Sequence, residues 1–389
     1  MPSTDLAPIT TTEDLAQFCA SLATVDYVTV DTEFMRETTY WPKVCLIQLA
    51  GPDEARVIDP LAEGLSLDPL LDLLRNKAVL KVFHAARQDL EIFTKLMGEV
   101  PAPLFDSQVA AMVCGFGDQV SYEQLVAKLA GAQVDKSSRF TDWARRPLTE
   151  KQVVYALGDV THLRKIYEKL NAKLQKTGRA EWLSEEMALL ADPATYEVAP
   201  DNAWKRLKPR TTKGEYLAVL QAAAAWRELE ARSRDIPRQR IVRDETLMEI
   251  AAHPPKSADD LERMRGLSKG FAEGKMGQGL LAAITAKLAS PKETWPVLER
   301  EPELPRGIGP LVELLKVLLK LKCDDHDVAQ KLLANTSDLD RIAADDNADV
   351  AAMHGWRREL FGNDALRLKR GELALAAQGT KIKLVELKK

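Results

Sequence analysis

The stretch VDYVTVDTE at residues 25–33 decides the fold of this chain and indicates its chemistry. Residues 25–30 predict a buried strand, and Asp31 and Glu33 follow at the end of that strand. Neighbouring carboxylates raise each other's pKa and cost free energy. Side chains two residues apart on a strand point to the same face, so both carboxylates face one point. The pattern therefore indicates a divalent cation, whose charge turns this repulsion into coordination.

Further acidic residues occur on two later predicted helices. Asp89 lies on a helix expected after the strand that ends at Phe83, and Asp159 lies on a long helix with Tyr155 one turn earlier on the same face. Three separate elements thus bring four carboxylates and a phenol to one cleft. Oxygen ligands of this kind suit two hard cations about 4 Å apart, which clamp a scissile phosphate and activate the attacking water.

Each of these motifs is common when it stands alone. An Asp-x-Glu pair often arises by chance or as a helix cap. Asp89 alone is explained equally well as an acid on a helix surface, and Tyr155 with Asp159 as an ordinary pair one helical turn apart. The ordered set is much more specific than its parts. The chain shows no P-loop, no Cys/His zinc spacing and no nucleophilic Ser or Cys next to a base.

Length and composition exclude several classes of protein. With 389 residues the chain suits two or three domains, and no apolar run approaches the roughly 18 residues of a membrane span. The N-terminus lacks the features of a signal peptide. The four cysteines are scattered, as expected of reduced thiols. We therefore expect a cytoplasmic protein without a membrane segment.

Residues 1–192 predict an α/β domain. Three strands follow one another as in a meander, a fourth strand comes later, and helices dominate the rest. Thr149 and Gln152 form a capping-box pattern at the start of the longest helix. The expected strands are 27–30, 44–50, 55–58 and 79–83, and the expected helices are 69–75, 86–97, 108–114, 122–129 and 150 to about 176.

The remainder predicts a linker and two helical modules. Prolines mark a linker at 193–209, and two similar helical segments follow at 210–290 and 291–389. Residues 260–263 (DLER) and 338–341 (DLDR) are the clearest repeated motifs. The first follows a cap at Ser257, and the second is expected to follow a cap at Thr336 or Ser337.

Charge is unevenly distributed along the chain. The net charge is −9 over residues 1–200, +5 over 201–290 and 0 over 291–389. A basic block beside an acidic one indicates one part that binds a polyanion and another that acts on it. A solvated, charge-rich surface would give the same net charges.

Taken in order, these motifs resemble the ribonuclease D family of DEDD-type 3′→5′ exonucleases, in the subgroup with tyrosine in the third motif. The resemblance implies a ribonuclease H-like domain with a mixed sheet flanked by helices, followed by two small all-α HRDC-like domains. The motifs that carry it are residues 30–36 (VDTEFMR), 39–42 (TYWP), 45–49 (CLIQL), 83–90 (FHAARQDL), 105–108 (FDSQ), 142–143 (DW) with 146–148 (RPL), 155–160 (YALGDV), 244–247 (DETL) and 355–357 (GWR).

The resemblance also implies roles for the acids. Asp31 would contact both of two Mg²⁺ or Mn²⁺ ions, Glu33 and Asp159 would complete the site of the ion that activates water, and Asp89 would hold the second ion, through water. Tyr155 would position the nucleophile.

Other residues are candidates for substrate contacts. Phe34 and Met35 could stack on the terminal base, although core packing explains either one equally well. For His84, a structural role near the cleft is a better explanation than a role as a ligand. The substrate-binding candidates are Thr32, Phe34, Met35, His84 and Arg139, and the candidates for phosphate contacts in the basic block are Lys205, Arg206, Lys208, Arg210, Arg238, Arg240 and Arg243.

We therefore predict a 3′→5′ exoribonuclease that releases 5′-mononucleotides. The choice of RNA, and of transfer-RNA precursors with a free 3′ end, rests on the family resemblance. A 3′→5′ DNA exonuclease would use the same metal chemistry, but no helicase or polymerase motif accompanies the acids. A non-catalytic nucleic-acid-binding scaffold would have lost an acid, and all four are present.

Overall fold

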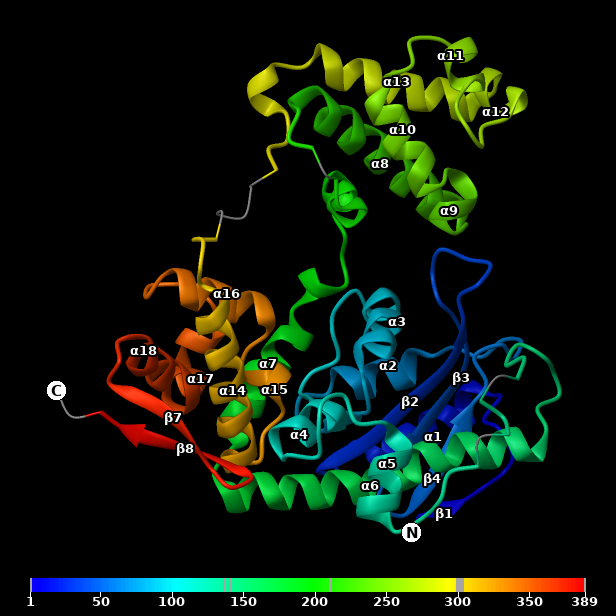
Figure 1. The fold of residues 1–389 in the computed structure, drawn as a ribbon. Helices are drawn as coiled ribbons and strands as arrows, with labels where there is room; N and C mark the ends of the chain where they lie inside the picture. The colour runs from blue at the N-terminus through cyan, green and yellow to red at the C-terminus, as the bar shows by residue number, and fades with distance from the viewer. Residues whose placement is uncertain (1, 136, 140, 210, 299–303, 388–389) are drawn as a thin grey trace.

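The computed structural model describes residues 2–135, 137–139, 141–209, 211–298 and 304–387, and Figure 1 shows three parts. An α/β domain carries the large sheet. The helices of a first helical domain span residues 214–289, and short helical turns join them to the α/β domain. A second module, residues 309–386, packs beside one end of the long helix α6. This arrangement confirms the predicted fold class, an α/β domain followed by helical modules.

The large sheet is mixed and has the strand order β1-β4-β3-β2-β5-β6. Strand β2 lies at its centre, antiparallel to β3 and parallel to β5. The meander β2-β3-β4 matches the three closely spaced strands of the sequence pattern. The strands are β1 (Ser3–Thr4), β2 (Tyr27–Met35), β3 (Lys43–Ala50), β4 (Glu54–Ile58), β5 (Leu80–Phe83) and β6 (Leu104–Asp106).

The expected end of the central strand was wrong. Strand β2 continues to Met35, so Asp31 and Glu33 lie within it. The backbone of this segment pairs with β3 as far as Met35 and Lys43, with a register shift between Glu33 and Phe34. Because the ladder satisfies the backbone hydrogen bonds, the strand persists through the two acids.

Helices cover both faces of this sheet. Helices α1, α2 and α3 bury one face, against Val28, Val30 and Ile47 among others. The long helix α6 buries the other face, against Cys45, Leu46 and Ala50. The helices of this domain are α1 (Thr12–Leu22), α2 (Asp68–Arg75), α3 (Arg87–Met97), α4 (Ser107–Val113), α5 (Tyr122–Leu125, extended by a π-helical turn at Val126–Ala130), α6 (Glu150–Thr177) and α7 (Ala180–Ala191).

The first helical domain has its own core around Leu220, Trp226 and Leu247. Part of the segment expected as a linker belongs to it, because a 3₁₀ turn at Pro200–Leu207 buries Trp204 in this core. Its helices are α8 (Gly214–Arg234), α9 (Arg238–Ile241), α10 (Asp244–Ala252), α11 (Ala258–Glu262), α12 (Lys269–Glu273) and α13 (Lys275–Ala289).

The C-terminal module repeats part of this pattern and adds a β-hairpin. Ser257 caps the helix with the first DLER-type motif, and Asn335, rather than the expected Thr336 or Ser337, caps its counterpart. The sequence predicted an all-α module in this region, so the β-hairpin was not expected. The elements are α14 (Gly309–His326), α15 (Gln330–Leu333), α16 (Thr336–Ala344), α17 (Gly355–Arg357), α18 (Asn363–Lys369), β7 (Leu373–Gln378) and β8 (Lys381–Glu386).

The C-terminal module and the α/β domain share one hydrophobic core. Leu170 and Leu174 of α6 pack in the same buried cluster as Leu315 and Leu319 of α14. At the boundary Trp182 stacks on Trp356 with ring centroids 4.3 Å apart and planes 7° apart. The predicted second module is therefore also a structural support for the long helix α6.

Candidate active site

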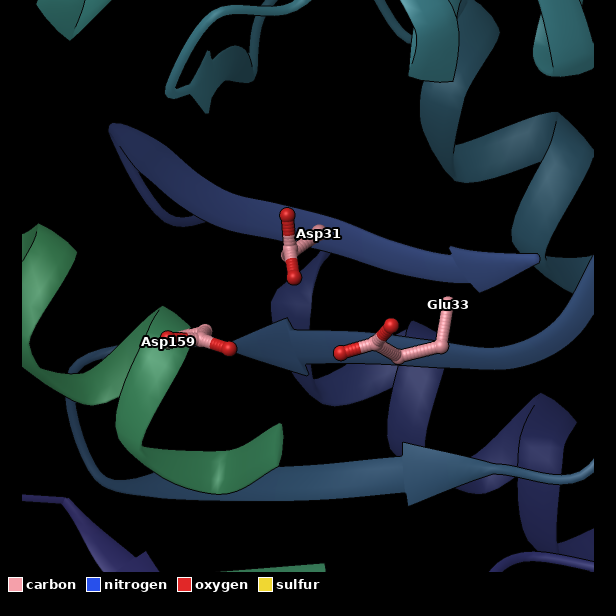
Figure 2. A group of neighbouring side chains, drawn as sticks. All are labelled: Asp31, Glu33 and Asp159. Carbon is pink, nitrogen blue, oxygen red and sulfur yellow. The ribbon is translucent and has the colours of Figure 1, made fainter. Parts of the chain in front are cut away.

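Three carboxylates meet above the centre of the sheet. Oxygens of Asp31 and Glu33 on β2 and of Asp159 on α6 lie within 4.8 Å of one another. Figure 2 shows the three side chains converging between the strand and the helix. Since every possible ligand atom in this group is a carboxylate oxygen, the group fits a hard cation such as Mg²⁺ or Mn²⁺.

Local structure explains why these side chains converge. Alternation along β2 places Thr29, Asp31 and Glu33 on the face that α6 covers. Thr29 Oγ1 donates a 2.8 Å hydrogen bond to the carbonyl of Val160, which fixes the helix against the strand next to Asp159. The predicted Thr149–Gln152 capping box starts α6.

Asp89 approaches from the other side of the same strand. It is buried on α3 and accepts a 2.5 Å hydrogen bond from Thr32 Oγ1. Thr32 points away from Asp31 and Glu33 because successive strand residues alternate. Asp89 therefore lies outside the three-carboxylate cluster, yet the charge of Asp31 is near enough to raise its pKa.

Burial raises the pKa of all four acids, and repulsion between acids of the site adds to the rise for Asp31, Glu33 and Asp89. Burial is the larger cause for Asp31, and the charge of Asp159 adds to it. The pKa of Glu33 rises to about 9 through burial and the charges of Asp31, Asp159 and Asp89. Burial raises the pKa of Asp159 to about 7, although a hydrogen bond with Tyr155 opposes the shift. Such a group of carboxylates favours its ionised form only when a cation is near.

Metal should stabilise the protein more strongly at high pH. Without metal, folded Glu33 keeps its proton up to about pH 9, whereas its ordinary pKa is 4.5. Between these values the folded state binds more protons than the unfolded state, so the free energy of unfolding falls as pH rises. A bound cation coordinates the carboxylates in their ionised form, so the free energy of unfolding no longer falls in this way as pH rises.

The measurement is a thermal melt with and without Mg²⁺ or Mn²⁺ at about pH 6 and about pH 9. We expect the larger metal-induced rise in melting temperature at the higher pH. Equal shifts at both pH values would contradict the assignment of these acids as ligands.

Two residues that position the acids were not predicted as site residues. The Tyr122 hydroxyl donates to the carbonyls of Gly158 (3.0 Å) and Asp159 (2.5 Å) and so holds α6 at the site. Asp106 accepts from the backbone N–H groups of Ala85 and Ala86 at 3.0 and 2.8 Å, which fixes the start of α3. Asp106 stands in one of the motifs that carry the family resemblance, but Tyr122 gives no sequence signal beyond its helix.

The predicted substrate-binding residues have varied surroundings. His84 contacts Ser107 Oγ through Nδ1 at 2.9 Å, and burial lowers its pKa to about 4, so the ring is neutral. Phe34 and Met35 are half-buried, and Met35 packs against the core beneath α6. Arg139 lies 3.8 Å from Glu123 in an ion pair. Phe34 thus remains the better candidate for a base contact.

The basic residues of the first helical domain divide into two sets. Arg238 is half-buried and forms an ion pair with Glu228, so it does not offer a free charge to phosphate. Arg210 lies outside the described residues. The exposed members of the predicted set are Lys205, Arg206, Lys208, Arg240 and Arg243.

No helix among the described residues is both long and apolar enough to cross a membrane.

Two family descriptions match this chain. The family described as 3′-5′ exonuclease matches residues 6–175, and the family described as HRDC domain matches residues 216–284. The exonuclease match contains all four acids and Tyr155. The HRDC match covers the first helical domain.

Curated relatives match the chain along nearly its whole length. Ribonuclease D of Granulibacter bethesdensis is 53% identical over 378 residues, which cover 97% of this chain and 96% of that protein. Ribonuclease D of Acidiphilium cryptum is 54% identical and covers 97% of each chain.

Among solved structures, the crystal structure of Escherichia coli RNase D, "an exoribonuclease involved in structured RNA processing", aligns with a TM-score of 0.79. It is 30% identical and the alignment covers 95% of this chain and 99% of that one. The catalytic core of RRP6 from Trypanosoma brucei, 22% identical with a TM-score of 0.54 over 74% of this chain and 80% of that one, shares the fold.

Proposed function

Because this chain belongs to the ribonuclease D family and is a 3′→5′ exoribonuclease, we propose that it trims the 3′ ends of transfer-RNA precursors and other small structured RNAs in the cytoplasm. The convergence of Asp31, Glu33 and Asp159 within 4.8 Å carries the proposal. The structured-RNA processing stated for the Escherichia coli relative supports the choice of substrate.

The acids divide into two groups that would hold two divalent ions, Mg²⁺ or Mn²⁺. Asp31, Glu33 and Asp159 form one group, and Asp89 lies outside it, near enough to Asp31 for that charge to raise the pKa of Asp89. Asp31 would contact both ions, Glu33 and Asp159 would complete the first site, and Asp89 would reach the second through water. When bound, such a pair supplies an activated water and stabilises the leaving oxygen.

The other site residues orient the reactants. Tyr155 stands one helical turn from Asp159 and hydrogen-bonds it, so its phenol can hold the attacking water in line. Burial raises the pKa of Tyr155 well above its usual range, so it stays protonated and donates. Phe34, two residues beyond Thr32 on β2, would stack on the terminal base.

A transfer-RNA transcript with a 3′ extension tests the proposed substrate. The protein should shorten the extension and slow sharply at the folded acceptor stem, because a helical duplex does not offer a single-stranded 3′ end. Matched single-stranded DNA of the extension sequence should be cut more slowly. Equal rates on the DNA strand would favour the DNA exonuclease instead, and a scaffold would cut neither.

Affinity for RNA should fall steeply with salt through the basic residues of the first helical domain. Each phosphate contact contributes a slope of about one in log affinity against log salt. The triple variant Lys208→Ala, Arg240→Ala and Arg243→Ala removes three exposed cations. The magnitude of this slope should be smaller by about two to three for the triple variant than for the unmodified protein.

The readout is binding of labelled RNA by fluorescence anisotropy across a salt series, with inactive Asp31→Ala as the common background. An unchanged slope would indicate that this domain binds a protein partner.

A further inference from the structure

A chamber of about 810 Å³ lies where the α/β domain meets the first helical domain. One wall is helix α3, and another is the β2–β3 loop, which rises toward α9 in Figure 1. The segment 194–206 and the α8–α9 corner complete it. We call this cavity the interdomain chamber. Four separate segments of the chain thus form one concave surface.

The interdomain chamber is distinct from the site of the acids. On α3 the lining residues Arg87, Glu91, Lys95 and Gly98 recur at helical spacing, so they share one face. Asp89 is turned by about 200° from Arg87 at 100° per residue, and its carboxylate contacts Thr32 on the opposite side. The same helix therefore serves the acids on one face and the chamber on the other.

Cations outnumber acids in the lining. Arg36 pairs with Glu91 at 2.7 and 2.8 Å, and Arg232 and Arg238 both contact the buried carboxylate of Glu228 just behind the wall. Glu197 is a further acid in the lining. The lining cations are Arg36, Arg87, Lys95, Arg206, Arg232 and Arg238, of which Arg87, Lys95 and Arg206 are exposed. The chamber thus keeps a positive surplus after its acids are counted.

Aromatic rings stand among these cations. Lys95 Nζ lies 3.9 Å from the centroid of the Trp41 ring, and Tyr196 lines the same wall. Tyr196 is half-buried and its hydroxyl donates to the carbonyl of Leu190 at 2.7 Å, which fixes the ring. Cationic side chains interleaved with fixed rings are the pattern that binds single-stranded nucleic acid, with phosphate on the cation and base on the ring.

The wall that carries Trp41 is held in place by polar contacts between the domains. The hydroxyl of Tyr40 donates to Glu228, Arg238 donates to Tyr40 at 2.8 Å, and the backbone N–H of Trp41 donates to Asp235 at 3.0 Å. Glu228 is 1% exposed. Burial by itself would raise the pKa of Glu228, but the hydrogen bonds with Arg238 and Tyr40 outweigh this effect and lower the pKa to about 2. A ligand in the chamber would therefore meet a preformed surface.

We propose that the interdomain chamber binds a single-stranded segment of the RNA substrate upstream of its reacting 3′ end, with phosphates on Arg87, Lys95 and Arg206 and a base on Trp41. Arg36 in the lining directly follows Met35, the last residue of the catalytic strand β2. This inference rests on the proposed action on RNA. It makes the chamber a determinant of substrate length, separate from the chemistry at the acids.

The test compares the double variant Lys95→Glu/Arg206→Glu with the control Lys77→Glu/Lys176→Glu. The control makes the same change in net charge at exposed residues outside the lining. Substrates are single-stranded RNAs from a dinucleotide to about twelve nucleotides. We expect the KM of the chamber variant for the long RNA to rise by about tenfold or more, because two phosphate contacts are lost. Its kcat, and its KM for the dinucleotide, should match those of the control.

Three outcomes separate the hypotheses. Equal KM values for the chamber variant and the control on long RNA would overturn the chamber proposal while leaving the exonuclease intact. An equal rise on the dinucleotide would also overturn it, because the effect would then lie at the acids. Inactivity of the unmodified protein on every RNA would instead refute the proposed function.

Photocrosslinking provides a second measurement that does not depend on turnover. RNAs with 4-thiouridine at single positions are bound to the full chain carrying Asp31→Ala, irradiated and mapped by mass spectrometry. A crosslink to the peptide of Trp41 or Tyr196 from an upstream nucleotide supports the proposal. Crosslinks from every position that all avoid both peptides would overturn it.

Discussion

Replacing Asp31 by alanine should abolish turnover, with a fall in rate of about 10² or more. Asp31 is the acid proposed to contact both ions, and its charge contributes to the raised pKa of both Glu33 and Asp89. Its loss leaves neither proposed ion properly held. The measurement is the initial rate of 5′-mononucleotide release from a labelled RNA strand under saturating Mg²⁺.

Two variants accompany Asp31→Ala. Asp26→Ala removes an exposed aspartate just before β2, so it should leave the rate unchanged and controls for the loss of a charge. Tyr155→Phe should keep the metal-induced thermal stabilisation and lower the rate, since it removes only the hydroxyl that we propose orients water. Undiminished turnover in Asp31→Ala would place the active site elsewhere.

Replacing Trp356 by alanine should destabilise the whole chain by about 3–5 kcal/mol, the usual cost of removing a large buried aromatic side chain. Trp356 is 7% exposed, stacks on Trp182 of α7 and lies in the core shared with α6. Its neighbour Arg357 also pairs with Glu185 at 2.5 Å and with Glu186. The loss therefore loosens the contact between the C-terminal module and the α/β domain.

Urea denaturation followed by tryptophan fluorescence and by circular dichroism measures this effect. Leu189→Ala, at a position 65% exposed on α7, is the control and should change stability by no more than about 0.5 kcal/mol. A Trp356→Ala stability equal to that of the control would show that the two parts fold independently.

Local patterns in the sequence predicted that Asp31 and Glu33 lie close together, whereas Asp89, expected in the same cleft, lies outside the three-carboxylate cluster. Alternation on a strand placed Asp31 and Glu33 on one face, and helical spacing placed Tyr155 beside Asp159. The confirmed α/β domain follows from apolar runs of the same kind. These patterns depend on residues that are near one another in the chain.

Features that depend on distant partners were missed. The extent of β2 is set by pairing with β3, and the role of Tyr122 is set by the carbonyls of α6. The shared core of α6 and α14 joins segments more than a hundred residues apart, so the apolar faces alone did not reveal their partner. The GWR motif at 355–357 resembled an HRDC feature, whereas its Trp and Arg contact α7.

Digestion of an RNA strand labelled at its 5′ end, with Mg²⁺ or with chelator, tests metal-dependent hydrolysis from the 3′ end directly. Because metal held by Asp31, Glu33, Asp89 and Asp159 would carry out the hydrolysis, we expect a ladder that shortens one nucleotide at a time from the 3′ end. We also expect an intact strand in chelator and with the Asp31→Ala variant. Undiminished cutting in chelator, or immediate release of a labelled mononucleotide from the 5′ end, would contradict this expectation.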